Sequence, residues 1–426
     1  MAGEGKRTSL REAGVTLIDC DHRTPPAADS GYPYVAIPQL KEGRLSLGDV
    51  RRISPEHFAE WTRKAKPQHY DVILSRRCNP GETAYVPAGL ECALGQNLVL
   101  LRADGKKLFP PFLRWLVRGT DWWEQVGTFI NVGAIFNSLK CADIPNFKIL
   151  LPPLAEQKAI AAVLGALDEK IELNQRMNAT MEAVARALFQ SWFVDFDPVR
   201  AKLDGRQPAG MDAATAALFP EHLEDSPLGH VPRGWKAGTV AEGFNLTMGQ
   251  SPPGNTYNEE CKGLPFYQGR TDFGFRFPTH RIYCTVPTRY ANPGDTLVSV
   301  RAPVGDINMA NEECCIGRGV AAVRHKSGAM SFTYHSMANL YPDFARFEAE
   351  GTVFGSINKD SFANLRFVIP PTEIVAAYER QAAPLDDKIR ILENQSRTLA
   401  TLRDTLLPKL LSGELSVAGF EKEVPA

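Results

Sequence analysis

The chain has 426 residues, a length that suggests two or three domains. Hydrophobic residues make up 44% and charged residues 23%, which is ordinary for a globular protein and excludes a disordered or fibrous chain. The 48 Lys and Arg residues balance the 49 Asp and Glu residues, so the formal net charge is −1. Because nucleic-acid binders are often basic overall, any DNA-binding surface here has to come from local clustering of charge.

The sequence carries no sign of a membrane segment, a leader or a metal site. No apolar run approaches the roughly 20 residues that span a bilayer. Residues 1–10 lack the apolar core of a signal peptide, so we expect a cytoplasmic protein. The eight cysteines form no CxxC pair and no Cys/His cluster with zinc-like spacing. We therefore predict no metal site and expect the cysteines to be small buried side chains.

The chain repeats itself with a period of about half its length, and the offset between matching motifs is nearly constant. The matching pairs are 24–26 with 251–253, 31–34 with 263–266, 71–77 with 295–301, 92–95 with 314–317, Arg102 with Arg324, 127–128 with 351–352, 152–153 with 370–371, and 167–171 with 385–389. We interpret the chain as two copies of one unit, each a globular part followed by a long helix.

In chain order, the first globular domain covers 1–153, with strands predicted at 71–74 and 97–101 and a helix at 112–118. A long helix follows over 154–196, and an Ala-, Pro- and Gly-rich connector over 197–225. The second globular domain covers 226–371, with strands at 296–300 and 319–323 and a helix at 341–350. A second long helix covers 372–413 and a loosely ordered tail 414–426. The fold class is therefore α+β, with two homologous, β-rich mixed domains.

Both long segments carry apolar residues at heptad spacing, which indicates a coiled coil. In the first helix one row holds Ile160, Leu167, Asn174, Met181 and Leu188, and a second row holds Val163, Met177 and Val184; in the second helix the main row is Tyr378, Leu385, Leu392, Leu399 and Leu406. We expect a kink or a short break at Pro384 and at Pro408. Asn174 is the polar member of its row, and such a residue often fixes helix register at a cost in stability.

The alternative is that each helix packs only on its own domain, as most amphipathic helices do. A length of about 40 residues, or roughly 60 Å, is too great for one small domain and favours pairing of the two helices.

Several segments of the sequence resemble the specificity subunits of type I restriction–modification systems. The central stretch carries most of this resemblance, at 151–157 (LPPLAEQ), 167–174 (LDEKIELN) and 188–197 (LFQSWFVDFD). Residues 226–235 (SPLGHVPRGW) resemble the opening of a second target-recognition domain, and 406–415 (LLPKLLSGEL) the family's closing segment. The first globular part departs from the pattern, since it has no counterpart of Gly234-Trp235.

The resemblance implies two target-recognition domains, each reading one half of a bipartite double-stranded DNA site. It implies that the two helices form an antiparallel coiled coil that separates these domains with pseudo-two-fold symmetry. Two methyltransferase subunits would dock on this scaffold and methylate adenine with S-adenosylmethionine. Restriction subunits, which use ATP and Mg²⁺, join them in systems that also cut DNA. All these cofactors belong to the partner subunits, and none is expected in this chain.

Catalytic motifs are missing from the sequence. It has no GxxxxGK[ST] phosphate loop and no Gly-rich strand–helix junction for S-adenosylmethionine. Residues 79–82 and 292–295 only superficially resemble the Asn-Pro-Pro-Tyr/Phe motif of adenine methyltransferases, and are better interpreted as turns. We therefore expect a non-catalytic subunit.

Two alternatives stay open. One is a stand-alone nuclease or methyltransferase with the same recognition domains, which methyl transfer by the chain alone would favour. The other is a structural coiled-coil adaptor with degenerate recognition domains, against which DNA retention by the assembled complex would count.

Residues that read DNA should be polar side chains on loops, since Arg, Lys, Asn and Gln make paired hydrogen bonds to base edges. In the first unit the candidates are Arg63, Lys64, Lys66, Arg76, Arg77, Asn79, Gln96, Asn97, Asn131 and Asn137. In the second they are Gln250, Ser251, Tyr257, Gln268, Arg270, Thr271, Arg301, Arg318, Ser356, Asn358 and Lys359. The plain alternative is that some are merely solvated or paired with local carboxylates, and that Arg77 and Arg301, being repeated, are structural.

Overall fold

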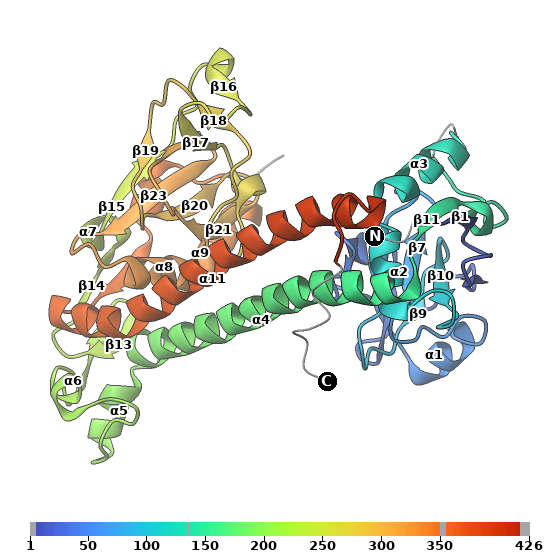
Figure 1. The fold of residues 1–426 in the computed structure, drawn as a ribbon. Helices are drawn as coiled ribbons and strands as arrows, with labels where there is room; N and C mark the ends of the chain where they lie inside the picture. Colours follow the sequence, from blue (N-terminus) through green and yellow to red (C-terminus); the bar gives the residue numbers. More distant parts are fainter. Residues whose placement is uncertain (1–5, 134–135, 350–354, 418–426) are drawn as a thin grey trace. The chain divides into compact units, whose positions relative to one another are not determined.

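The computed structural model describes residues 6–133, 136–349 and 355–417, and the chain divides into two compact units (Figure 1). Unit 1 comprises Met1–Ile171 and Arg397–Ala426, and unit 2 comprises Glu172–Ser396. Each unit therefore contains one globular part together with a portion of each long helix. Among the described residues, no helix combines the length and apolar character needed to cross a membrane.

The centre of unit 1 is an antiparallel sheet with the strand order β2-β10-β7-β8. Its inner strands are runs of Val, Ile and Leu that are fully buried, because both faces of the sheet are covered. A smaller sheet, β6-β3-β9, and the pairs β1-β11 and β4-β5 complete the unit. The strands are β1 (Lys6–Ser9), β2 (Val15–Asp19), β3 (Tyr32–Val35), β4 (Leu40–Lys41), β5 (Arg44–Leu45), β6 (Arg52–Ile53), β7 (Val72–Ser75), β8 (Thr83–Tyr85), β9 (Ala93–Leu94), β10 (Leu98–Ala103) and β11 (Lys148–Leu151).

Short helices lie beside the sheets of unit 1 (Figure 1). α2 (Pro110–Leu116) packs on β8 and β10, and α3 (Thr120–Phe129) packs on β11. α1 (Pro55–Trp61) begins where the Ser54 hydroxyl accepts a hydrogen bond from the His57 backbone N–H, with Pro55 in the first turn. Two 3₁₀ turns are η1 (Ile37–Gln39) and η2 (Ile144–Asn146).

Unit 2 repeats the topology of unit 1. Its central sheet, β15-β23-β20-β21, matches β2-β10-β7-β8, and the parallel pair β17-β22 matches β3-β9. The pair β14-β24 matches β1-β11, so the first copy opens with the same strand although it lacks a Gly-Trp pair. The strands are β12 (Leu223–Ser226), β13 (Gly229–Pro232), β14 (Lys236–Thr239), β15 (Phe244–Met248), β16 (Tyr257–Asn258), β17 (Leu264–Tyr267), β18 (Tyr283–Cys284), β19 (Tyr290–Ala291), β20 (Thr296–Val300), β21 (Val304–Met309), β22 (Cys314–Ile316), β23 (Val320–His325) and β24 (Arg366–Ile369).

Helices α8 (Met330–Asn339) and α9 (Tyr341–Ala349) pack on β21 of this sheet, and α8 also contacts β20 and β23. The short helices α7 (Val240–Gly243) and α10 (Lys359–Ala363) and the 3₁₀ turns η3 (Gly254–Thr256) and η4 (Arg270–Asp272) lie in the connections. The strands and helices predicted from composition are all present within a few residues. The matched pair 351–352 and Glu350 lie outside the described residues.

A partly buried ion pair explains two of the repeated positions. The Arg102 guanidinium donates from Nε and Nη2 to the two carboxylate oxygens of Asp71, at 2.8 and 2.6 Å. In unit 2 Arg324 donates from Nε to Asp295, at 2.5 Å. Both pairs join the start of one inner strand to the end of its neighbour, so each copy of the sheet has the same clamp.

The long helices are α4 (Leu154–Phe193) and α11 (Thr372–Ser412). Within unit 2 they run antiparallel, because Asn174 donates to Gln395 and Ser396 whereas Tyr378 donates to the backbone oxygen of Ala185. We expected a kink or a short break at each of Pro384 and Pro408; a break is wrong, since α11 is continuous through both prolines, and a kink stays a prediction. Each proline removes a single backbone hydrogen bond, and the buried neighbours Ala382 and Leu410 keep the helix packed.

One of the predicted rows is displaced. The main row predicted on each helix does face inward. Its buried members are Ile160, Asn174 and Leu392, and its half-buried members are Leu167, Met181, Leu188, Leu385, Leu399 and Leu406. In the second row, Met177 and Val184 are instead 37% and 52% exposed. The buried row lies one residue later, at Leu164, Ile171, Asn178, Ala185 and Trp192. A polar Asn178 and a small Ala185 hide this row from a search for large apolar residues.

The repeated motif at 167–171 and 385–389 anchors each globular part to the helices. In unit 1 the carboxylate of Asp168 pairs with Arg114, with Arg44 at 3.1 Å and with Arg403 of α11 at 2.6 Å. Burial alone would raise the pKa of Asp168, but the charges of these arginines outweigh it and hold the pKa below its usual value. In unit 2 the matching Asp386 pairs with the fully buried Arg276.

The segment 197–225, which we interpreted as a connector, carries α5 (Asp197–Leu203) and α6 (Ala213–Ala217). Val199 and Phe219 lie in the hydrophobic core of unit 2, and the Phe219 ring meets Trp192 edge-on at 5.1 Å. The helices are too short for an apolar period to be visible in the sequence. Of the tail 414–426, Val417 is buried in unit 1, and residues 418–426 lie outside the described residues.

Candidate nucleic-acid interface

Three loops meet at one end of the central sheet of unit 1, where β7 ends and β10 begins. The Arg76 backbone N–H donates to the Asn97 oxygen at 3.0 Å, and the Leu139 N–H donates to the Arg76 oxygen at 2.8 Å. Arg77 also forms a β-bridge with Ser138. Loops that are far apart in the sequence are thereby fixed side by side by backbone hydrogen bonds. We call residues 76–79, 96–97, 131–133 and 136–139 the sheet-end surface of unit 1.

Unit 2 builds the same arrangement with the same bonds. The Val300 N–H donates to the Gly319 oxygen at 2.9 Å, and the Ile357 N–H donates to the Val300 oxygen at 3.0 Å. Arg301 bridges Ser356 as Arg77 bridges Ser138. We call residues 300–302, 317–319 and 355–358 the sheet-end surface of unit 2. The parallel strand β17 ends beside it, since the Gly317 N–H donates to the Tyr267 oxygen at 2.9 Å, which brings Gln268 close.

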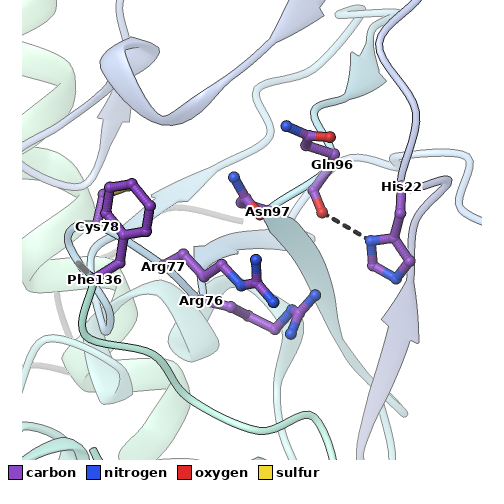
Figure 2. A pocket seen from close by; sticks show the side chains of 7 residues that line it. All are labelled: His22, Arg76, Arg77, Cys78, Gln96, Asn97 and Phe136. Atoms are coloured by element: carbon purple, nitrogen blue, oxygen red, sulfur yellow. Dashed lines mark hydrogen bonds between the residues drawn. The ribbon is translucent and has the colours of Figure 1, made fainter. Parts of the chain in front are cut away.

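A cavity of 440 Å³, lined mostly by polar and charged residues, opens on the sheet-end surface of unit 1. Figure 2 shows the guanidinium groups of Arg76 and Arg77 between Phe136 on one side and His22 on the other. The His22 Nδ1 lies 2.8 Å from the Gln96 backbone oxygen. Because a carbonyl oxygen only accepts, Nδ1 carries the proton. The cavity is lined by His22, Arg76, Arg77, Cys78, Gln96, Asn97 and Phe136.

The two guanidinium groups in this cavity differ from those arginines that pair with a carboxylate. No carboxylate among the described residues pairs with Arg76 or Arg77, and the Arg76 Nε is buried with no hydrogen-bond partner. Arg102, by contrast, is bound to Asp71 on two atoms. A positively charged, hydrogen-bonding surface with unused donors is suited to binding an anion or a base edge.

Most candidate residues expose their side chains, as a binding role requires. Those that are only partly exposed are Arg76, Asn97, Asn131, Ser251 and Tyr257. The exposed ones are Arg63, Lys64, Lys66, Arg77, Asn79, Gln96, Asn137, Gln250, Gln268, Arg270, Thr271, Arg301, Arg318, Ser356, Asn358 and Lys359. Their contact with DNA stays a prediction.

Several candidates have local partners. The Arg63–Lys66 cluster is not part of the cavity, and Lys66 pairs with Glu91 at 3.6 Å. Its backbone oxygen accepts from Arg102, near the far end of β10. In unit 2, Arg270 pairs with Asp306 at 2.6 Å and the Asn358 side chain caps α10 by accepting from Ser361.

Three further candidates have hydrogen bonds that orient them. The Asn131 side chain donates to the Phe129 backbone oxygen at 3.3 Å. The Tyr257 hydroxyl donates to the Pro252 oxygen at 2.7 Å, and Ser251 accepts from the Arg318 N–H at 3.3 Å. These bonds place both loops of unit 2 against each other.

The sequence analysis missed His22, Cys78 and Phe136, which also line the cavity. Phe136 was detectable in principle, because it is a large aromatic residue inside a polar, glycine-containing loop that already held two candidates, and it is 55% exposed. His22 is separated from the other loops by more than 50 residues, so only the fold reveals its position.

The ligand atoms of Asp19, Cys20 and His22 lie within 4.8 Å of one another. Hydrogen bonds account for this group without a metal ion. The Cys20 thiol donates to the Gly95 oxygen at 3.2 Å, and burial raises its pKa to about 11, which disfavours the thiolate that binds metals. The His22 ring nitrogens face Gln96 and Asp19.

Comparison with known proteins finds one matching family model and several similar proteins. Residues 22–183 match the family model described as the type I restriction modification DNA specificity domain. The specificity subunit of the type I restriction enzyme MjaX of Methanocaldococcus jannaschii is 28% identical over 91% of this chain and 88% of its own length. The chain is similar to type I restriction–modification specificity subunits over most of its length. The HindI specificity subunit of Haemophilus influenzae is 25% identical over 80% of this chain and 86% of its own length.

A solved structure has the same fold as this chain. The type I restriction–modification S subunit from M. genitalium superposes with a TM-score of 0.57 at 15% identity, covering 95% of this chain and 96% of that one. This likeness shows that the chain shares a mixed α and β fold with that protein. The sequence-based prediction of a resemblance to specificity subunits and of a mixed α and β fold is confirmed.

Proposed function

We propose that this chain is a specificity subunit that recognises a bipartite double-stranded DNA target, with the sheet-end surface of each unit reading one half. The observation that carries the proposal is the duplication of that surface. Each copy fixes the same three loops by the same backbone bonds, while the loops themselves carry different side chains. A duplicated frame with different side chains is suited to reading two different half-sites.

The side chains present fit DNA. Arginine, asparagine and glutamine offer paired donors or acceptors to base edges, and arginine also binds phosphates. The unpaired Arg76 and Arg77 supply positive charge in unit 1, and Arg301 and Arg318 do so in unit 2. Because the whole chain is nearly neutral, partner subunits should supply much of the phosphate contact.

We infer that α4 and α11 form an antiparallel coiled coil that spaces the two half-sites along DNA. The contacts of Asn174 with Gln395 in unit 2, and of Asp168 with Arg403 in unit 1, support pairing of the helices. Pairing over such a length makes a stiff spacer, because each residue adds about 1.5 Å.

Two adenine methyltransferase subunits, which hold S-adenosylmethionine, would dock on this scaffold, and restriction subunits would join in a system that cuts DNA. On α4 the side chains of Leu173, Met177 and Val184 are apolar and 37–52% exposed. Leu173 and Met177 are four residues apart, and Val184 follows two turns later, so they share one helix face. Such a face supports docking of a partner helix.

The test is to co-express the chain with the neighbouring methyltransferase gene and to map methylated adenines across the genome. A bipartite motif is expected. Replacing residues 226–371 with the matching domain of a relative should change one half of the motif and leave the other intact. A change in both halves, or methylation without a bipartite motif, would contradict the proposed function.

A further inference from the structure

The two sheet-end surfaces can be compared position by position, because the same backbone bonds define them. Arg77 and Ser138 are matched by Arg301 and Ser356, so these positions are the same in both units. Among the polar positions of unit 1 that differ, Arg76 is matched by Val300, Gln96 by Arg318, and Asn97 by Gly319. Since phosphates are alike at every site, shared residues suit phosphate contact, and residues that differ suit contact with bases.

Arg76 has the surroundings of a base-reading residue. Its backbone is fixed on both sides, by Asn97 and by Leu139. Its side chain is half-buried, its Nε is buried without a partner, and no carboxylate among the described residues neutralises it. A half-buried charge without a partner is costly for the free protein, so nothing in unit 1 itself explains why an arginine stands here. Arg77 beside it is exposed.

We propose that Arg76 reads a guanine in the half-site of unit 1, while Arg77 and Arg301 contact phosphates in both half-sites. The planar guanidinium would donate from its two terminal nitrogens to O6 and N7 of guanine, which are the paired acceptors of that base in the major groove. Val300 cannot make these bonds, so unit 2 selects its bases through other positions. This assignment rests on the function proposed above.

The experiment uses the whole chain assembled with its methyltransferase subunits. Arg76→Val places the residue of unit 2 in unit 1, and Arg77→Ala is the matched control on the same loop. With Arg76→Val, one guanine position in the half-site of unit 1 should become degenerate, with discrimination at that base pair falling about 10- to 100-fold. The other half-site should not change. With Arg77→Ala, methylation should weaken at all sites with the motif unchanged. The slope of the logarithm of the DNA-binding constant against the logarithm of the salt concentration should fall in magnitude by about one.

A chemical probe keeps the assignment testable if Arg76→Val does not fold. In a synthetic target, 7-deazaguanine at the assigned position removes N7 and should weaken binding of the parent complex about 10-fold or more, whereas deaza substitution at the other guanines of that half-site should not. Equal losses at all guanines, an unchanged motif with Arg76→Val, or a uniform loss with that variant would each overturn the assignment. The proposed function would stand in those cases, because the parent would still methylate a bipartite motif. A parent without such a motif would overturn both.

Discussion

The buried Arg276 offers a sharp test of how unit 2 is held on its helices. Its side chain is 0% exposed, pairs with Glu182 of α4 and with Asp386 of α11, and lies 3.8 Å above the ring of Tyr334. Arg276→Met leaves two carboxylates without their counter-charge, and breaking a buried pair in this way costs about 3–5 kcal/mol. For a unit of this size each kcal/mol lowers the Tm by about 2–4 °C. The Tm of unit 2 should therefore fall by about 6–20 °C.

The assay is thermal unfolding at pH 7 together with pulsed proteolysis and mass spectrometry, which assigns the early transition to unit 2. Arg390→Met is the control, since Arg390 makes only an exposed pair with Asp387 on α11 and should change the Tm little. Adding Glu182→Gln and Asp386→Asn to Arg276→Met should restore most of the loss. A loss below about 1 kcal/mol for Arg276→Met would refute the reasoning, because the carboxylates would then not depend on the arginine.

Four other outcomes are expected. Burial, and then the charges of Arg276 and Arg186, lower the pKa of His335 from 6.5 to about 3. Between pH 3 and pH 6.5, His335 is therefore protonated in the unfolded chain but not in the folded one. The stability that depends on neutral His335 should be fully present above pH 6.5, and the free energy of unfolding should fall by roughly 1.4 kcal/mol per pH unit below it. In urea titrations at several pH values, His335→Gln should make the free energy of unfolding depend less steeply on pH. An equally steep pH dependence in this variant contradicts the prediction. Asn174→Leu should raise the Tm of unit 2 by a few degrees, since the buried Asn174 Oδ1 has no partner, and a lower Tm would count against it. Four residues inserted after Asn174 and after Leu392 should lengthen the gap between half-sites by about one or two base pairs in methylome maps, and an active variant with an unchanged gap would exclude the helices as the spacer. The isolated chain should bind DNA weakly at physiological salt, and sub-micromolar, sequence-specific binding in a fluorescence titration would contradict this.

Much of the fold could be predicted from the sequence, because the determinants are local or repeated. The strands 72–75 and 296–300 stand out by their β-branched residues. The ion pair of Asp71 with Arg102 recurs in the second copy as Asp295 with Arg324, and these residues match in the sequence repeat. The helix rows were less visible. The buried row through Asn178 and Ala185 contains few large apolar side chains, so exposed Met177 and Val184 took its place in the prediction.

The candidate site could be predicted only in part. Arg76, Arg77, Gln96 and Asn97 were chosen as polar residues at turns, and the structure brings these four together in one cavity. Their proximity depends on hydrogen bonds between loops that are 20 to 60 residues apart, and the sequence carries no local signal for these bonds. For the same reason, the separation of the Arg63–Lys66 cluster from this cavity could not be foreseen.

The division of the long helices between the units has a consequence for synthesis on the ribosome. Unit 1 takes Arg403, Leu407 and Leu410 from α11 into its ion pairs and core, and these residues are translated after the whole of unit 2. While 172–396 is being made, Asp168 lacks the Arg403 that helps to neutralise it, and part of the first core is open to water. A released chain that ends before residue 397 should therefore hold every residue of unit 2 but lack the part of α11 that completes unit 1.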